Sequence, residues 1–271
     1  MERDEMQPDH AADTAPLFET INVSKSFGVF RAISNVSFRV SDGEFVSIVG
    51  PNGAGKTTLV NVVTGLLRPT AGAVRFLGRD IAGIGPVELA RLGMSRTFQL
   101  VNIFPALTVR ETLAVAVASR LRRVGNPFRS LGRDDALQAD VERVAEVLGL
   151  RARLETVALA LSQGEKKLLD IASAFALNPV VILLDEPTSG VSTGDKHAIM
   201  GVLVAAAKAA GVRAIVQVEH DMDLVERYSH RIVALQEGTV LADMPPDAFF
   251  KDPAMIAAVA GTRPQTQRKP H

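Results

Sequence analysis

A glycine-rich run stands between a short apolar segment and a helical pattern near residue 50. Residues 45–49 (FVSIV) are typical of a strand, and residues 58–64 are typical of a helix that ends at Gly65. The eight residues 50–57, GPNGAGKT, satisfy the spacing G-x-x-x-x-G-K-[ST]. A strand, a tight loop and a helix in this order predict an α/β domain.

Each fixed position of the run has a role in binding a triphosphate. The glycines allow the backbone to wrap closely and to direct successive N–H groups inward. Lys56 adds positive charge for the outer phosphates, and the hydroxyl of Thr57 can ligate Mg²⁺. A phosphate would lie at a helix N-terminus, which favours an anion. The alternative is a glycine-rich turn that matches by accident. The predicted ATP-binding residues are Gly50, Pro51, Asn52, Gly53, Ala54, Gly55, Lys56, Thr57 and Thr58.

The composition narrows the class of protein. With 271 residues, of which 47% are hydrophobic, the chain can form one large domain or two modest ones. The 30 Lys and Arg residues balance the 30 Asp and Glu residues, so there is no overall basic footprint for nucleic acid. Cysteine is absent, which excludes disulfides and thiolate metal sites and suits a reducing compartment.

The residue pattern is first strand-rich, then helix-rich, then alternating. Alternating runs in residues 17–40 predict an antiparallel layer, and the apolar runs 180–184 and 214–218 predict buried parallel strands. From about residue 100 to residue 176 the period becomes helical, which predicts a mostly helical subdomain inserted into an α/β core. Its clearest stripe consists of Leu137, Val141, Val144 and Leu148.

We expect one domain over residues 17–261, containing the helical subdomain at about 100–176. Residues 1–16 and 262–271 are polar and are expected to be disordered, and the loop 122–133 is expected to be the most flexible internal part. No apolar run approaches the roughly 20 residues of a membrane-spanning helix. The acidic N-terminus lacks the apolar core of a signal peptide.

Residues 181–186 (VILLDE) contribute a second piece of chemistry. A carboxylate at the end of a buried strand, here Asp185, can hold Mg²⁺. The neighbouring Glu186 can deprotonate an attacking water molecule. Neighbouring strand residues point to opposite faces, so the two roles require a bend, which Pro187 favours. The alternative is a pair of solvated acids that merely end a strand.

Together these motifs resemble the nucleotide-binding subunits of ABC transporters, over about residues 17–261. Residues 161–165 (LSQGE) resemble the ABC signature. The resemblance implies an α/β fold with a RecA-like P-loop NTPase core, an antiparallel β layer and an inserted helical subdomain. It also implies that Ser162 and Gly164 contact the γ-phosphate of ATP held by a second subunit. An ordinary capping box between Ser162 and Glu165 is compatible with that role.

Three further positions take roles from the same resemblance. Gln99, in RTFQ, resembles the Q-loop glutamine that senses Mg²⁺ and links the ATP site to the membrane partner. His220, in VEHD, resembles the switch histidine that contacts the γ-phosphate. Phe27 stands where the family stacks an aromatic ring on adenine, with a buried core phenylalanine as the alternative. The implied catalytic residues are Glu186, His220 and Gln99, and the implied metal ligands are Thr57, Gln99 and Asp185.

Two positions depart from the family pattern. The third signature position is Gln163 rather than glycine, a position where the family tolerates variation. Ser192 stands where many members have an acidic D-loop residue, so its hydrogen bonds across a dimer would carry no charge.

Within the family, the segments RTFQ and VEHDM and the C-terminal ending look most like importers of branched-chain or hydrophobic amino acids. The resemblance implies an ATP- and Mg²⁺-dependent ATPase that is cytoplasmic and peripheral on the inner face of the cell membrane. Its implied partners are a second ATPase subunit, identical or related, integral membrane permeases on separate chains and, indirectly, a solute-binding protein. No nucleic acid is expected. The alternatives are a soluble ABC ATPase outside any transporter, a regulator without turnover, and an importer of another small solute such as urea or amides.

Overall fold

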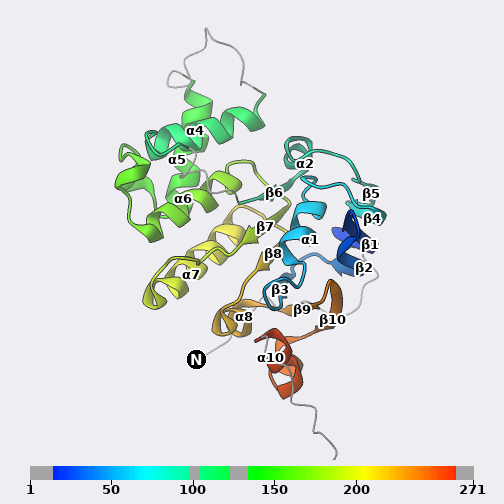
Figure 1. Ribbon diagram of the computed structural model, residues 1–271. Helices are drawn as coiled ribbons and strands as arrows, with labels where there is room; N and C mark the ends of the chain where they lie inside the picture. The colour runs from blue at the N-terminus through cyan, green and yellow to red at the C-terminus, as the bar shows by residue number, and fades with distance from the viewer. Residues whose placement is uncertain (1–14, 98–103, 123–133, 261–271) are drawn as a thin grey trace, which may run out of the picture. The chain divides into compact units, whose positions relative to one another are not determined.

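The computed structural model describes residues 15–97, 104–122 and 134–260. The chain divides into two compact units, which are described separately. Unit 1 is Met1–Ile84 with Val216–His271, and unit 2 is Gly85–Ile215. Strands and helices occur in both units (Figure 1). The helical segment predicted for residues 100–176 falls inside unit 2, and its limits stay a prediction, as do those of the domain at 17–261.

Unit 1 contains an antiparallel sheet, which confirms the layer predicted for residues 17–40. Its strands are β1 (Phe18–Phe27), β2 (Phe30–Val40), β4 (Ala71–Phe76) and β5 (Arg79–Asp80), in the order β2-β1-β4-β5. Phe18 lies opposite Val40 in the β1–β2 pair. Val36, Phe38 and Val40 are buried while the residues between them are exposed, the period of two expected of a half-buried strand.

A second group of strands in unit 1 carries the glycine-rich run. It consists of β3 (Phe45–Val49), β9 (Arg231–Gln236), β10 (Thr239–Met244) and the C-terminal part of β8 (Ala214–Val218), in the order β10-β9-β3-β8. β3 pairs with β9 in parallel and β9 with β10 antiparallel. Every residue of β3 is buried, as its mainly apolar sequence predicts. Its one polar residue, Ser47, accepts a hydrogen bond from Gln217 Nε2 at 2.8 Å. The helices of unit 1 are α1 (Lys56–Val63), α8 (Met222–Tyr228), α9 (Pro246–Phe249) and α10 (Pro253–Val259).

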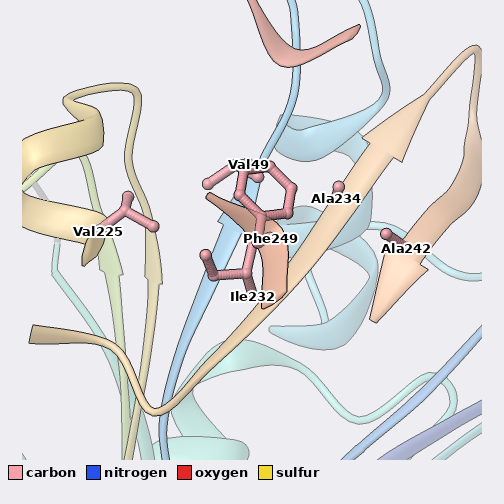
Figure 2. Close-up of a cluster of buried hydrophobic side chains, with 6 residues drawn as sticks. All are labelled: Val49, Val225, Ile232, Ala234, Ala242 and Phe249. Atoms are coloured by element: carbon pink, nitrogen blue, oxygen red, sulfur yellow. The ribbon is translucent and has the colours of Figure 1, made fainter. Parts of the chain in front are cut away.

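An apolar cluster fixes the end of β3. In Figure 2 the ring of Phe249, from α9, lies beside Val49 and Ile232, with Val225, Ala234 and Ala242 completing the cluster. Phe249 and Val49 are fully buried, and Val49 is the last residue before the glycine-rich run. Truncating a buried phenylalanine to alanine typically costs about 3–5 kcal/mol of stability. Packing therefore holds the strand that positions the run.

Unit 2 combines a pair of parallel strands with helices. The strands are β6 (Met94–Arg96) and β7 (Val181–Asp185), and Met94 lies opposite Val181. The helices are α2 (Pro86–Leu92), α4 (Val109–Arg120), α5 (Asp135–Val147), α6 (Gln163–Phe175) and α7 (Thr193–Ala209), with short 3-10 helices η2 (Arg151–Arg153) and η3 (Ala158–Ala160). Thr108 and Asp134 cap α4 and α5 through side-chain oxygens.

The predicted apolar stripe is confirmed on α5 and the residue that ends it. Leu137, Val141, Val144 and Leu148 are each at most 3% exposed. Gly149, with φ +70°, follows the helix as predicted. Residues 1–14, 123–133 and 261–271 lie outside the described residues, and the predictions of disordered termini and of a flexible loop fall largely on them. None of the helices in the described ranges has both the length and the apolar character needed to cross a membrane.

Candidate nucleotide-binding site

The glycine-rich run of unit 1 forms the loop between β3 and α1. The helix was expected to begin at Thr58 but begins at Lys56, because Gly55 acts as its N-cap with φ +98°. Lys56, Thr57 and Thr58 therefore occupy the first turn, where backbone N–H groups have no intrahelical acceptor. These amides and the positive end of the helix dipole form a site for a phosphate group.

Two glycines of this loop are required by their surroundings. A Cβ atom at Gly50 would lie 2.3 Å from the backbone oxygen of Leu235, and one at Gly55 would lie 2.7 Å from that of Ala32. Both residues also have positive φ, which side chains rarely tolerate. The backbone of unit 1 thus forces the loop into its tight path.

Lys56 points its charge back along the loop. Its Nζ donates to the backbone oxygen of Gly50 at 2.6 Å and to that of Pro51 at 3.0 Å. The ammonium group is therefore held by the carbonyls of the first two residues of the loop. Thr57 is exposed, so its hydroxyl is accessible to a ligand.

The end of β8 lies beside this loop, within unit 1. The amide of Glu219 donates to the backbone oxygen of Ile48 at 3.3 Å. The carboxylate of Glu219 is buried, and its Oε1 accepts from the amides of His220 (2.9 Å) and Asp221 (3.2 Å). The His220 side chain is 61% exposed and its Nδ1 lies 3.5 Å from the same Oε1. Glu219 therefore fixes the backbone of the predicted switch histidine, a role that the sequence pattern did not single out.

Phe27 ends β1 at the tip of the β1–β2 hairpin. Its ring is 48% exposed, which argues against the alternative of a buried core phenylalanine. The Nζ of Lys25 lies 5.3 Å from the ring centroid, within reach of a cation–π contact. The exposed face is suited to stacking on a planar base.

Unit 2 holds the two predicted carboxylates at the end of β7. Arg96 Nη2 donates to Asp185 Oδ2 at 2.6 Å, and Thr97 Oγ1 accepts from the Asp185 amide at 3.3 Å. Glu186 has φ +48°, so the chain bends between the two acids as their separate roles require. Its backbone oxygen accepts from Lys167 Nζ at 2.9 Å. Arg96 and Lys167, which lie 89 and 19 residues away from their partners, were missed by the sequence reasoning.

The signature segment of unit 2 forms the start of α6. Ser162 is the N-cap, its Oγ accepts from the amide of Glu165 (3.3 Å), and Glu165 Oε2 accepts from the amide of Ser162 (2.8 Å). This confirms the capping box. The amides of Gln163 and Gly164, in the first turn, have no intrahelical acceptor.

The surroundings of Gly164 differ from those of the loop glycines. A Cβ atom there would meet only Ile199 Cδ1 at 3.8 Å, an ordinary contact. Gly164 also lies within a helix, where alanine is favoured. Nothing described in unit 2 therefore requires a glycine at this position.

Two predicted positions remain. Gln99 lies outside the described residues. Ser192 is the N-cap residue of α7, and its Oγ donates to Asp195 Oδ2 at 2.7 Å. The uncharged Ser192 at the D-loop position is therefore hydrogen-bonded to the carboxylate of Asp195.

A cavity of about 190 Å³ lies in unit 2 beside the end of β6. Its lining includes Arg96, Phe104, Val115 from α4 and Leu177 beyond α6. Phe104 and Val115 are each 42% exposed. The sequence predicts that Gln99 links the ATP site to a membrane partner. Of the residues that follow it, 104–108 are described, and Phe104 lines this cavity.

The structure brings the phosphate loop, Phe27 and His220 into unit 1, and Asp185, Glu186 and the signature segment into unit 2. A phosphate loop, a strand that ends in Asp-Glu, and a mixed antiparallel and parallel α/β fold define a P-loop ATPase of the ATP-binding-cassette class.

Comparison with known proteins gives the family. The family model described as "ABC transporter" matches residues 33–189. The ATP-binding protein LivG of high-affinity branched-chain amino acid transport in Salmonella typhimurium is 33% identical, over 91% of this chain and 98% of LivG. The chain belongs to the ABC transporter family, as one of its ATP-binding subunits.

Solved structures agree with this assignment. The ADP conformation of an ATP-binding cassette of an ABC transporter is similar with a TM-score of 0.80 and 30% identity, covering 92% of this chain and 100% of that one. A dimeric cassette in a post-hydrolysis state, bound to ADP and Pi, is similar with a TM-score of 0.69 and 26% identity, covering 84% and 98% of the two chains.

Proposed function

We propose that this chain is the ATP-hydrolysing motor subunit of an importer of branched-chain or hydrophobic amino acids. The observation that carries the proposal is its similarity to LivG over almost the full length of both chains. The geometry supports it, because the loop of unit 1 offers a phosphate site and unit 2 places Glu186 at a bend after Asp185.

In unit 1, nucleotide binding rests on the start of α1. Lys56 and the first-turn amides hold the phosphates, and the exposed ring of Phe27 stacks on the adenine. His220, whose backbone is fixed by Glu219, positions the γ-phosphate. We assign the remaining loop residues to the same site, because they connect β3 to the first turn of α1.

In unit 2, Glu186 is the general base that takes a proton from the attacking water. The hydroxyl of Thr57, the carboxylate of Asp185 and the amide oxygen of Gln99 are oxygen donors of the kind that Mg²⁺ prefers. The bound ion would neutralise charge that develops on the phosphates. Arg96 holds the Asp185 carboxylate in one orientation.

The start of α6 serves the ATP of a second subunit, identical or related. Ser162 and the amide of Gly164 receive the γ-phosphate held by the partner's loop. Charge-assisted hydrogen bonds contribute about 1.5–3 kcal/mol each. A few of them, made only when the pair closes, supply the ~5.5 kcal/mol that nearly completes an open-to-closed switch. Hydrolysis removes these contacts, and the pair reopens.

Coupling to transport requires integral membrane permeases on separate chains. We assign their docking to the cavity lined by Phe104 and Val115, because it is partly apolar and is also lined by Arg96, which holds Asp185. Its occupant therefore lies one side chain away from the metal-binding carboxylate. This role places the chain in the cytoplasm, peripheral on the inner face of the cell membrane.

Reconstitution in proteoliposomes with a candidate permease pair tests the proposal. ATP-driven uptake of labelled leucine is expected, with urea and acetamide as competing solutes. The Glu186→Gln chain is the matched control, expected to bind ATP but to support neither hydrolysis nor uptake. Hydrolysis by this variant at the parental rate would exclude Glu186 as the base. Uptake of urea or acetamide in place of leucine would reassign the solute, and failure to bind any permease would favour a soluble ATPase.

A further inference from the structure

The first turn of α6 carries a carboxylate whose two oxygens are both engaged. Glu165 Oε2 accepts from the backbone amide of Ser162 at 2.8 Å. Glu165 Oε1 accepts from Arg153 Nε at 2.7 Å, and Arg153 is the last residue of η2. The side chains are 26% exposed for Glu165 and 54% exposed for Arg153.

This carboxylate is ionised at neutral pH. The Ser162 amide is the main group that holds the pKa of Glu165 below its ordinary value, and Arg153 adds to the effect. A negative charge in the first turn favours the helix itself, but it repels a phosphate that approaches the same turn. Glu165 and Gly164 lie in the same helical turn, which rises about 5.4 Å, so the repulsion is only partly screened at physiological salt, where the Debye length is about 8 Å.

We propose that Arg153 is a positioning residue that compensates the charge of Glu165, so that the start of α6 can receive the γ-phosphate of a second subunit. The inference rests on the proposed function of the signature segment. It assigns Arg153 no contact with the nucleotide: the arginine acts through Glu165.

A purely structural role does not account for the arginine in the Arg153–Glu165 pair. Glu165 is already held by the capping box with Ser162, which requires no arginine. Ion pairs with an exposed partner contribute little to stability. The neighbouring Arg151 forms an ion pair with Glu146 of α5 at 2.9 Å, and neither residue of this pair belongs to the capping box. The Arg151 pair is therefore a matched control within the same short helix.

The two accounts predict different signs. If the pair is structural, Arg153→Gln and Glu165→Gln break it equally and weaken ATP-driven association equally. If Arg153 compensates charge, Arg153→Gln leaves the negative charge exposed and weakens association. Glu165→Gln keeps an oxygen for the Ser162 amide, removes the negative charge, and maintains or strengthens association. The double variant Arg153→Gln/Glu165→Gln restores the parental value.

The experiment measures the monomer–dimer dissociation constant of the full chain by sedimentation, in saturating MgATP and in the Glu186→Gln background. We expect Arg153→Gln to raise this constant roughly threefold to thirtyfold, because a symmetric pair carries the change twice. Arg151→Gln is expected to leave it unchanged. Raising the salt concentration should shrink the difference between Arg153→Gln and the parent.

Equal weakening by both single variants would overturn the inference in favour of a structural pair. A double variant as weak as Arg153→Gln alone would also overturn it, because Arg153 would then act on the phosphate directly. If the parent with an intact pair fails to associate with ATP, the premise that the start of α6 receives the γ-phosphate held by a second copy of this chain is wrong. The two failures are therefore distinguishable.

Discussion

The starts of α1 and α6 offer the same chemistry, a helix N-terminus for a phosphate, but the surroundings of their glycines differ. At α1, Gly50 and Gly55 are required by the backbone of their own unit, which would collide with any side chain there. At α6, Gly164 has room for a methyl group and an ordinary helical conformation. The cation at α1, Lys56, also bonds to its own loop.

This difference indicates how the two half-sites are used. The start of α1 is shaped by unit 1, and we propose that it holds the phosphates by itself. The start of α6 is stabilised by its capping box but leaves a bare backbone surface at Gly164. No contact within the unit requires a glycine at position 164, so its lack of a side chain favours the close approach of another molecule to the backbone. The predictions below test this contrast, from the largest expected effect to the smallest.

Replacing Gly55 by alanine should be the most damaging change. The collision at 2.7 Å with the backbone oxygen of Ala32 and the φ of +98° leave no relaxed position for a Cβ atom. We expect a loss of about 2–5 kcal/mol in the free energy of unfolding. Gly53→Ala is the control, since a Cβ there meets nothing within 4 Å and only the positive φ adds strain. Urea unfolding that ranks the two variants equally would contradict the steric argument.

Lys56→Ala should weaken nucleotide binding by the monomer without unfolding it. Loss of charge-assisted bonds worth about 1.5–3 kcal/mol corresponds to roughly a tenfold to hundredfold rise in Kd for ATP. Calorimetric titration measures this constant. Ser162→Ala is the comparison variant and should leave the monomer's affinity for ATP unchanged, while its lost cap reduces stability by about 1 kcal/mol. An equal loss of affinity for ATP in both variants would contradict the proposal that only the start of α1 binds ATP in the monomer.

Gly164→Ala should separate stability from association. The free energy of unfolding is expected to stay level or rise by up to about 1 kcal/mol, because alanine is the better helix former. ATP-driven pairing in the Glu186→Gln background should weaken severalfold, since the methyl group occupies the approach to the amide. Unfolding and sedimentation of the same samples measure both quantities. A destabilised chain that pairs normally would reverse this assignment.

The smallest effect concerns pH. The pKa of Glu165 is lowered from its ordinary value of 4.5, chiefly by the Ser162 amide. A carboxyl with a depressed pKa in the folded state stabilises the fold above its ordinary pKa, and this contribution is lost as the pH falls through the folded value. Below pH 4.5 the parent should therefore lose stability more steeply than Glu165→Gln. If the free energies of unfolding of the two chains change in parallel between pH 5 and about pH 3, this prediction is wrong.

Local patterns predicted much of the fold and the site. The mainly apolar run of β3, the alternation of β2 and the stripe of α5 are each visible within a dozen residues, and the structure contains all three elements. The start of α1 was misplaced by two residues, because the N-cap role of Gly55 depends on a left-handed backbone rather than on residue type.

Contacts between distant segments were beyond those patterns. Arg96 with Asp185 and Lys167 with Glu186 depend on tertiary packing, which no local period encodes. Glu219 is next to His220 in sequence, but its burial also depends on packing. Motif resemblance named the residues with roles, but it could not name the side chains that hold them. The roles assigned to all of these site residues, Gln99 and Ser162 included, stay predictions.

A mixing experiment tests the central claim most directly. In the Glu186→Gln background, a chain with Lys56→Ala keeps only its signature, and a chain with Gly164→Asp, whose carboxylate repels a phosphate at the start of α6, keeps only its loop. With MgATP, fluorescence energy transfer between labelled chains should report little pairing for either variant alone and clear pairing when they are mixed, because the mixture rebuilds one composite site. A mixture that associates no better than its components, or a single variant that pairs like the parent, would contradict the account.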